Sequence, residues 1–333
     1  MKGTSLKAAV RRALEGLSLP APGETLVAAL SGGADSVALL DALAWLARET
    51  GFVVVAAHLD HGLRHDSAED ATSCEALSAR LGVRLVSARS DVAARARRER
   101  QGIEAAARGA RYEFLRRVKD EIGAVAIAVA HTRDDQAETF LMRLLRGSGS
   151  VGLGAMRASA GDVIRPLLSV SREEVLKHLD ARDLPHREDE SNRDLRYTRN
   201  RVRHELIPYL ERHFNPRVRA ALARTAALVA AESDLISSRS GVSLDEVDGV
   251  LPLVALRRLP LAERRVAVRR SIEGAGGLRG VAAIHMERIL RLASRPDARG
   301  HRVDLPGRRQ AVFGPGGLRI GPAQAETRRG TNA

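Results

Sequence analysis

The chain of 333 residues has one cysteine, Cys74, and few aromatic residues. A single cysteine excludes a disulfide within the chain and any metal or redox site built on a Cys-x-x-Cys pair. Aromatic residues make up only 3% of the sequence, so stacking platforms for nucleic-acid bases are scarce. The longest apolar stretches, FVVVAA and AVAIAVA, are too short to cross a bilayer, and the start lacks the apolar segment of a signal peptide. We therefore expect a cytoplasmic protein without a membrane segment.

Lysine is also scarce, so nearly all the positive charge is carried by arginine. The formal net charge is +13, and such an excess favours a polyanionic partner. Much arginine beside much alanine and glycine is also what a GC-rich genome produces. The positions of the arginines are therefore more informative than their number.

Apolar runs alternate with helical stretches in the first part of the chain. TLVAAL, FVVVAAHL, VRLVSA and AVAIAVA have the continuous apolar pattern of strands that are buried on both faces. Helices are predicted between them over residues 34–48, 67–81, 103–121 and 134–145. This alternation predicts an α/β fold, a parallel twisted sheet with helices on both faces. The polar segments SGGADS, HLDHGLRHDS and AHTRDDQAET follow three of the strands, where ligands bind in such folds.

The alternation weakens in the second half of the chain. VIRPLL is compatible with one more strand, and the next segment predicts a helix with Ser171 as its N-cap and Glu174 three residues later. Residues 215–295 predict several helices, and HRVDLPGRRQAVFGPGGLRI predicts a small hairpin. We therefore predict three parts: a catalytic domain over residues 1–212, a smaller, mainly helical domain that ends in the hairpin over 213–321, and a disordered tail over 322–333.

The segment SGGADS lies between the first predicted strand and the helix that follows it. A Walker loop would need a lysine and a hydroxyl after its second glycine, and this segment has no such lysine. Its glycines still let backbone N–H groups approach an anion at the positive end of the helix. Asp35 would repel phosphate unless a cation lies between them, so it is a candidate magnesium ligand. The predicted phosphate-binding residues are Ser31, Gly32, Gly33, Ala34, Asp35 and Ser36.

This hexapeptide resembles the pyrophosphate loop of the N-type ATP pyrophosphatases. The resemblance implies a Rossmann-like domain that cleaves ATP between its α and β phosphates and adenylylates a substrate oxygen. Longer blocks resemble the tRNA(Ile)-lysidine synthase family: AHLDHGLRHDS, GIEAAARGARY, AHTRDDQAETFLMRLLRGSG, IRPLL and EDESNRDLRYTRNRVRHELIP. They cover most of residues 24–210 in the order typical of that family, and the resemblance is weaker beyond.

The resemblance to this family implies a reaction in two steps. The minor isoleucine tRNA with the anticodon CAU is adenylylated with ATP and Mg²⁺ at the C2 oxygen of its wobble cytidine. The ε-amine of free L-lysine then displaces AMP to give lysidine. Asp60 stands where some members have asparagine, and we assign no role to it.

Two carboxylates fit the second step. Free lysine is protonated, with a pKa of about 10.4, so a carboxylate must orient its ammonium and take the proton or pass it to water. Asp135 and Glu138 are spaced i to i+3 on one helical face, and the resemblance implies this role for them. The simpler alternative is an Asp-rich helix start in which Asp134 and Asp135 only favour the helix dipole.

Arginines beside these carboxylates would stabilise the AMP leaving group. The resemblance implies Arg111 and Arg203 for this role, and Arg108 and Arg199 are near neighbours that could replace them. His58 is predicted to contact adenosine.

The arginines are densest between residues 193 and 224, where phosphate contacts would position tRNA. The residues predicted to bind tRNA are Arg193, Arg196, Tyr197 and Arg199, with Tyr197 as the candidate stacking platform. The sequence leaves open whether the protein forms a homodimer.

Two alternative functions remain: one is enzymatic and uses the same ATP loop, and the other is non-catalytic. A tRNA cytidine-thiolating enzyme would need thiolates to hold a cluster or carry sulfur, which one cysteine cannot supply. A non-catalytic tRNA-binding relative would tolerate substitutions in SGGADS and DDQAET, yet both segments are intact.

Overall fold

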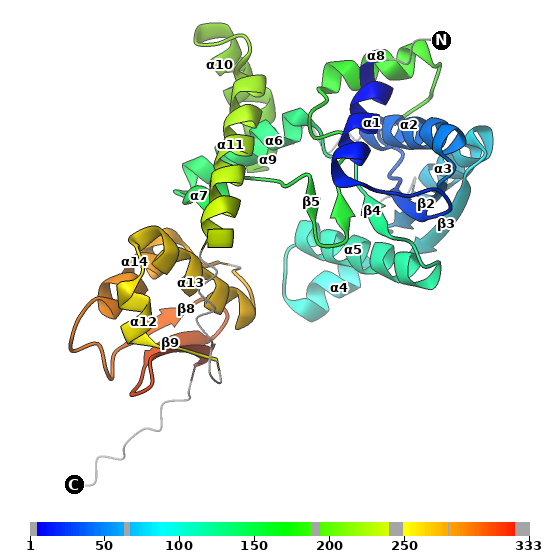
Figure 1. The fold of residues 1–333 in the computed structure, drawn as a ribbon. Coiled ribbons are helices and arrows are strands. Elements are labelled where there is room, and N and C mark those ends of the chain that lie inside the picture. The colour runs from blue at the N-terminus through cyan, green and yellow to red at the C-terminus, as the bar shows by residue number, and fades with distance from the viewer. Residues whose placement is uncertain (1–4, 63–66, 188–193, 240–248, 279, 324–333) are drawn as a thin grey trace. The chain divides into compact units, whose positions relative to one another are not determined.

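The computed structural model describes residues 5–62, 67–187, 194–239, 249–278 and 280–323 (Figure 1). The chain divides into two compact units, the first made of residues 1–142 and 156–226 and the second of residues 143–155 and 227–333. Within the described ranges, no helix has the length and apolarity needed to cross a membrane.

The first unit is built on a six-stranded sheet in the order β3-β2-β1-β4-β6-β5 (Figure 1). All neighbours are parallel except β5, which pairs antiparallel with β6 at one edge. This confirms the predicted parallel sheet. The strands are β1 (Thr25–Ala29), β2 (Val53–Asp60), β3 (Arg84–Arg89), β4 (Ala126–Ala128), β5 (Ser159–Ala160) and β6 (Val163–Ile164).

Helices cover both faces of this sheet. Leu26 and Ala28 of β1 face a core shared with α1, α2, α3 and α8, whereas Val27 between them faces α5. This alternation is the period of two that a strand imposes on its side chains. The helices of this part are α1 (Ser5–Leu17), α2 (Ala34–Thr50), α3 (Ser67–Leu81), α4 (Val92–Glu99), α5 (Ile103–Glu121), α6 (Arg133–Leu145) and α8 (Arg172–Ala181).

One strand departs from the expected burial. The prediction of strands buried on both faces was wrong for β3, whose residues are exposed or half-buried. The physical reason is that β3 lies at the edge of the sheet, where only β2 pairs with it.

The predicted boundary between residues 212 and 213 falls inside α10 (Ile207–His213), whereas the two units separate after Ala226, within α11 (Val218–Arg239). The reason is apolar packing: Ile207 of α10 and Leu222 of α11 belong to one cluster with Leu141 of α6. The start of α11 is therefore part of the first unit.

The second unit contains an antiparallel sheet in the order β7-β10-β9-β8. The predicted hairpin is thus a three-stranded meander extended by the short strand β7. Gly317 has φ +145°, and a Cβ on it would lie 2.1 Å from the carbonyl oxygen of Leu251, so glycine is required where β10 approaches β7. The elements are α7 (Ser150–Leu153), β7 (Val250–Leu251), α12 (Leu253–Arg258), α13 (Leu261–Gly274), α14 (Ala283–Ala293), β8 (Arg302–Leu305), β9 (Arg309–Phe313) and β10 (Leu318–Pro322).

The predicted tail begins too early. Pro322 pairs with Arg309 in the sheet, and the backbone N–H of Ala323 donates to the carbonyl of Arg308. The rest of the predicted tail, residues 324–333, lies outside the described residues.

A buried ion network joins three helices of the first unit. Asp41 of α2 is 2% exposed and accepts hydrogen bonds from His178 Nε2 at 2.8 Å and Arg182 Nη2 at 3.1 Å. Lys7 Nζ of α1 lies 3.8 Å from the same carboxylate. Burial opposes ionisation of Asp41, but these hydrogen bonds and charges outweigh it and lower its pKa to about 2.

We expect Asp41→Asn to lower the free energy of unfolding by about 3 kcal/mol at pH 7, because it leaves buried cations without their counter-charge. The folded-state pKa of Asp41 is depressed, so its contribution is present above the unfolded pKa of about 3.9 and is lost as the pH falls toward 2. Urea unfolding at several pH values measures this, with the exposed Asp183→Asn as control. An equal difference between wild type and Asp41→Asn at pH 7 and at pH 3 would contradict the assignment.

Candidate active site

The loop after β1 has the backbone of an anion cradle. Gly32 has φ +79°, a conformation that favours glycine, and Gly33 is the extended residue before α2. Ser36 Oγ donates to the carbonyl of Gly33 at 2.8 Å, and the backbone N–H of Ser31 donates to Ser36 Oγ at 3.2 Å. These hydrogen bonds within the loop fix its conformation at the N-terminus of α2.

Arg187, which the sequence analysis did not single out, braces this loop from a distant segment. Its backbone N–H donates to the carbonyl of Gly32 at 3.0 Å, and its side chain forms an ion pair with Asp70 of α3 at 2.7 Å. The loop is thereby held between α2, α3 and the segment that follows α8.

Asp35 lies in the first turn of α2, and only one of its two carboxylate oxygens has a partner among the described residues. Oδ2 pairs with Arg172 Nη1 at 2.7 Å, whereas Oδ1 is buried without a hydrogen-bond partner among the described residues. Burial raises the pKa of Asp35, and Arg172 opposes this rise. An unpartnered carboxylate oxygen beside a phosphate cradle fits Mg²⁺. The described residues contain no group of three or more His, Cys, Asp or Glu that could hold a metal, so phosphate and water would supply the other ligands.

His58 lies directly against the loop. Its Nδ1 is 3.0 Å from the carbonyl oxygen of Leu30 and 3.5 Å from Cys74 Sγ, while Nε2 is buried without a partner among the described residues. A carbonyl can only accept, so Nδ1 carries a hydrogen and donates to Leu30. Cys74 is buried, and burial raises the pKa of its thiol to about 12, so it is no nucleophile at neutral pH.

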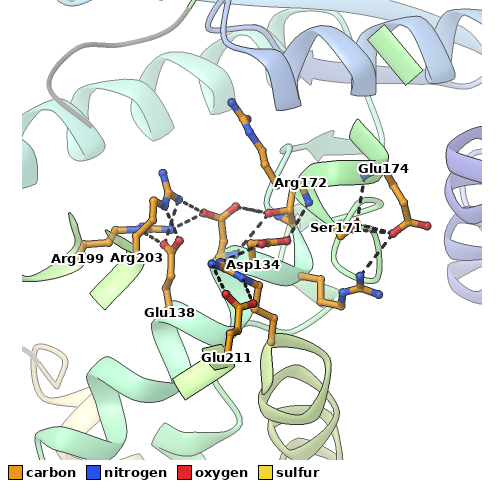
Figure 2. A network of polar contacts seen from close by, with 12 residues as sticks. Asp134, Glu138, Ser171, Arg172, Glu174, Arg199, Arg203 and Glu211 are labelled. Atoms are coloured by element: carbon orange, nitrogen blue, oxygen red, sulfur yellow. Dashed lines mark hydrogen bonds and ion pairs between the residues drawn. The ribbon is translucent and has the colours of Figure 1, made fainter. Parts of the chain in front are cut away.

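The predicted carboxylates Asp135 and Glu138 lie together on α6 and share two arginines. Figure 2 shows Arg199 and Arg203 beside Glu138. Arg199 donates to Asp135 Oδ1 at 2.6 Å and to Glu138 Oε2 at 2.9 Å. Arg203 donates to Glu138 Oε1 at 2.5 Å and to Asp135 Oδ1 at 3.2 Å. Two of the four candidates for the arginine role, Arg199 and Arg203, therefore contact both carboxylates.

Local structure explains this arrangement. The N–H and hydroxyl of Thr132, just before α6, donate to Asp135 Oδ2 at 2.8 and 3.1 Å and fix the carboxylate. Arg199 lies in α9 (Thr198–Arg201) and Arg203 four residues later in a π-helical turn (Val202–Leu206), a type of turn that is frequent at functional sites. Spacing by four places both guanidiniums on one side.

The cluster keeps Asp135 ionised although this residue is buried. Burial alone would raise the pKa of Asp135, but Arg199 and the hydrogen bond from Thr132 outweigh it and the pKa is lowered. The carboxylates in turn raise the pKa of Arg199 and Arg203 against the effect of burial. The four side chains together carry no net charge.

Asp134, next in sequence to Asp135, makes a separate set of contacts (Figure 2). It accepts from the backbone N–H of Arg172 at 2.8 Å and from Arg219 Nη1 at 3.1 Å. Arg219 also pairs with Glu211 at 2.8 Å. Asp134 thus ties α6 to α8 and α11, so the alternative in which both aspartates only favour the helix dipole does not describe their contacts.

The remaining predicted residues fall at different places. Arg111 is half-buried on α5, and burial together with the charges of Arg108 and Arg199 lowers its pKa. Arg196 is exposed and pairs with Asp194 at 2.7 Å. Tyr197 is exposed at the start of α9. Arg193 lies outside the described residues.

Two family models match the chain. One, described as a PP-loop domain, matches residues 6–210, and one described as a TilS substrate binding domain matches residues 251–313. These matches correspond to parts of the first and the second unit.

Curated relatives agree with the motif blocks. The tRNA(Ile)-lysidine synthase of Thermobifida fusca is 40% identical over 309 residues, which cover 92% of this chain and 93% of that protein. That of Geobacter sulfurreducens is 43% identical over 296 residues, which cover 86% of this chain and 62% of that protein. The chain therefore spans less than two thirds of one relative and nearly all of the other.

A solved structure has the same fold. The U34-tRNA thiolase from Methanococcus maripaludis, solved with its 4Fe-4S cluster, aligns with a TM-score of 0.57 and 17% identity, covering 68% of this chain and 78% of that one. At this identity the likeness shows the fold alone.

We expect Gly32→Ala to weaken ATP binding about tenfold, or 1.4 kcal/mol, because alanine favours negative φ and would turn the loop's N–H groups away from the phosphates. The added Cβ would meet Cys74 Sγ at an ordinary 3.7 Å, so backbone conformation causes the loss. Calorimetric titration with ATP measures it.

Gly123→Ala is the matched control for this substitution. Gly123 has φ +65° with nothing within 4 Å of a Cβ, so it should lose similar stability and keep ATP affinity. Equal ATP affinity in both variants would mean that the loop does not hold the phosphates.

Proposed function

The chain belongs to the tRNA(Ile)-lysidine synthase family, and on that premise we propose that it joins L-lysine to the wobble cytidine of the tRNA(Ile) with anticodon CAU, using ATP. The observation that carries the proposal is the cluster of the buried Asp135 and Glu138 with the half-buried Arg199 and Arg203, in the same unit as the glycine loop. It offers both an anion for an ammonium and cations for a departing phosphate.

In the first step, the loop from Ser31 to Ser36 holds the β and γ phosphates of ATP. The cytidine C2 oxygen attacks the α phosphorus, an adenylyl bond forms, and pyrophosphate leaves. Mg²⁺ held by Asp35 would neutralise charge on the pyrophosphate. Arg172 is paired with Asp35, but its side chain is 39% exposed, so it can turn toward phosphate when a cation takes its place.

In the second step, Asp135 orients the lysine ammonium. Its side chain is 12% exposed and that of Glu138 is 0% exposed, so only Asp135 can be reached by an incoming amine. Its lowered pKa makes it a poor proton acceptor for an amine, and the proton therefore passes to water as the C–N bond forms. The bond from C2 to the adenylate oxygen breaks with its electron pair, and AMP leaves.

Glu138 has a positioning role in this proposal. It is fully buried and holds Arg203 Nε at 2.5 Å and Arg199 Nε at 2.9 Å. The guanidiniums it fixes stabilise the charge that develops on AMP. Arg111, beside Arg199, adds positive charge without an ion pair to a carboxylate among the described residues.

We assign tRNA docking to the second unit together with Arg193, Arg196 and Tyr197. The match of residues 251–313 to a substrate-binding domain supports this assignment.

Thiolation is the weaker candidate. The fold is shared with a tRNA thiolase, but that protein was solved with an iron–sulfur cluster. The only cysteine here is buried, and burial raises its thiol pKa to about 12.

The proposal is tested by incubating the protein with ATP, Mg²⁺, labelled L-lysine and an unmodified tRNA(Ile) transcript with CAU. Nucleoside analysis should find lysidine at the wobble position, with one pyrophosphate released for each lysine incorporated. A transcript with the anticodon GAU is the control. Pyrophosphate release without lysine in the product would overturn the assignment of the second step.

We expect Asp135→Asn to reduce lysine transfer by about 10²- to 10⁴-fold, because asparagine cannot hold the ammonium by charge. Pyrophosphate release that depends on tRNA should change by less than about threefold. The exposed Asp120→Asn on α5 is the control and should match wild type in both assays. Unchanged lysine transfer in Asp135→Asn would remove Asp135 from the mechanism.

A further inference from the structure

Three arginines gather around one aromatic ring beside the catalytic carboxylates. Arg108 and Arg111 of α5 place their guanidinium carbons 4.9 and 5.5 Å from the centre of the Tyr112 ring. Arg165, just after β6, is half-buried, and burial together with the charge of Arg108 lowers its pKa. We call these four residues and His131 the Tyr112 cluster.

The cluster has no counter-charge of its own. Among the described residues, neither Arg108, Arg111 nor Arg165 forms an ion pair with a carboxylate. Arg116 shows the contrast: its guanidinium lies 5.9 Å from the same ring, but it pairs with Asp162 at 3.1 Å. The Tyr112 cluster therefore carries three positive charges that the described part of the chain does not balance.

The positive charges of the Tyr112 cluster also affect the pKa of His131. Burial and the charges of Arg165, Arg111 and Arg108 together lower the pKa of His131 to about 4, against the opposing charge of Asp135. His131 is thus neutral at pH 7. Since Asp135 and the three arginines all act on His131, the Tyr112 cluster adjoins the carboxylate site.

Buried polar atoms in the cluster also lack partners. Arg165 Nε and His131 Nδ1 are buried and have no hydrogen-bond partner among the described residues. A buried donor without a partner is unfavourable, so a ligand with several acceptor oxygens would be stabilised here. Positive charge together with unused donors is the chemistry that binds a phosphate.

The position of the cluster distinguishes RNA phosphate from the phosphates of ATP. The glycine loop follows β1 and has its own backbone amides and Asp35 for a triphosphate. The Tyr112 cluster comes from α5 and from the ends of β4 and β6, next to Asp135, where the modified base must lie. The phosphates that flank this base are the anions left to neutralise.

We propose that the Tyr112 cluster binds a backbone phosphodiester of the RNA, next to the nucleotide that is modified at Asp135. This inference rests on the proposed function, since it takes RNA as the substrate.

The test compares Arg108→Gln and Arg165→Gln with Arg116→Gln, which removes a neighbouring arginine of the same ring that already has a carboxylate partner. Binding of the CAU transcript is measured by fluorescence anisotropy at several salt concentrations, without ATP or lysine. We expect each cluster variant to bind about tenfold more weakly at low salt and to lower the slope of log K against log salt by about 0.7. Arg116→Gln should keep the wild-type slope.

The outcomes of the experiment distinguish RNA from ATP as the ligand of the Tyr112 cluster. A wild-type slope in Arg108→Gln and Arg165→Gln would overturn the proposal. A loss of ATP affinity with unchanged RNA binding would also overturn it and assign the cluster to the nucleotide. Should Arg165→Gln fail to fold, the exposed Arg108→Gln carries the same test.

Failure of this proposal is separable from failure of the proposed function. Wild-type protein that makes lysidine, together with variants of unchanged slope, would refute the Tyr112 cluster alone. Wild-type protein that makes no lysidine, together with variants of reduced slope, would refute the reaction and keep the cluster as an RNA site.

Discussion

The mutual neutralisation of two carboxylates and two arginines is the interaction on which the site depends. Asp135 and Glu138 are buried, and a buried carboxylate without a partner would take up a proton instead of staying charged. Arg199 and Arg203 remove that penalty through hydrogen bonds to both acids. The opposite charges of the four side chains therefore balance within the cluster, which allows carboxylates to stay buried in a strongly basic chain.

The neighbouring residues Asp134 and Asp135 make different contacts. Asp135 faces the arginine pair, whereas Asp134 holds the start of α8 through Arg172 and the start of α11 through Arg219. Arg172 then reaches Asp35 of the glycine loop at 2.7 Å. The start of α6 thus connects the phosphate cradle, the carboxylate cluster and the helix that leads out of the first unit.

The sequence predicts the local features of this structure well and the distant ones poorly. Helices 67–81 and 103–121, the capping box of Ser171 and Glu174, and the pair Asp135 and Glu138 follow from spacing within one element, and the structure contains all of them. The contact of Arg187 with Gly32 and that of Arg172 with Asp35 join residues more than a hundred positions apart, for which no local pattern exists. The two-residue strand β7 likewise forms only because β10 provides an edge.

In the proposed reaction, an ammonium bound at Asp135 changes how strongly Arg199 and Arg203 can stabilise the leaving AMP. While Asp135 and Glu138 hold Arg199 and Arg203, those arginines have little positive charge to offer an anion. An ammonium at Asp135 takes over part of that carboxylate's charge and competes with the arginines, whose side chains are 38% and 32% exposed and free to shift. The guanidiniums then become available as AMP begins to leave. Binding of the lysine ammonium would in this way strengthen the stabilisation of the leaving AMP. A water molecule at Asp135 carries no charge and would not have this effect.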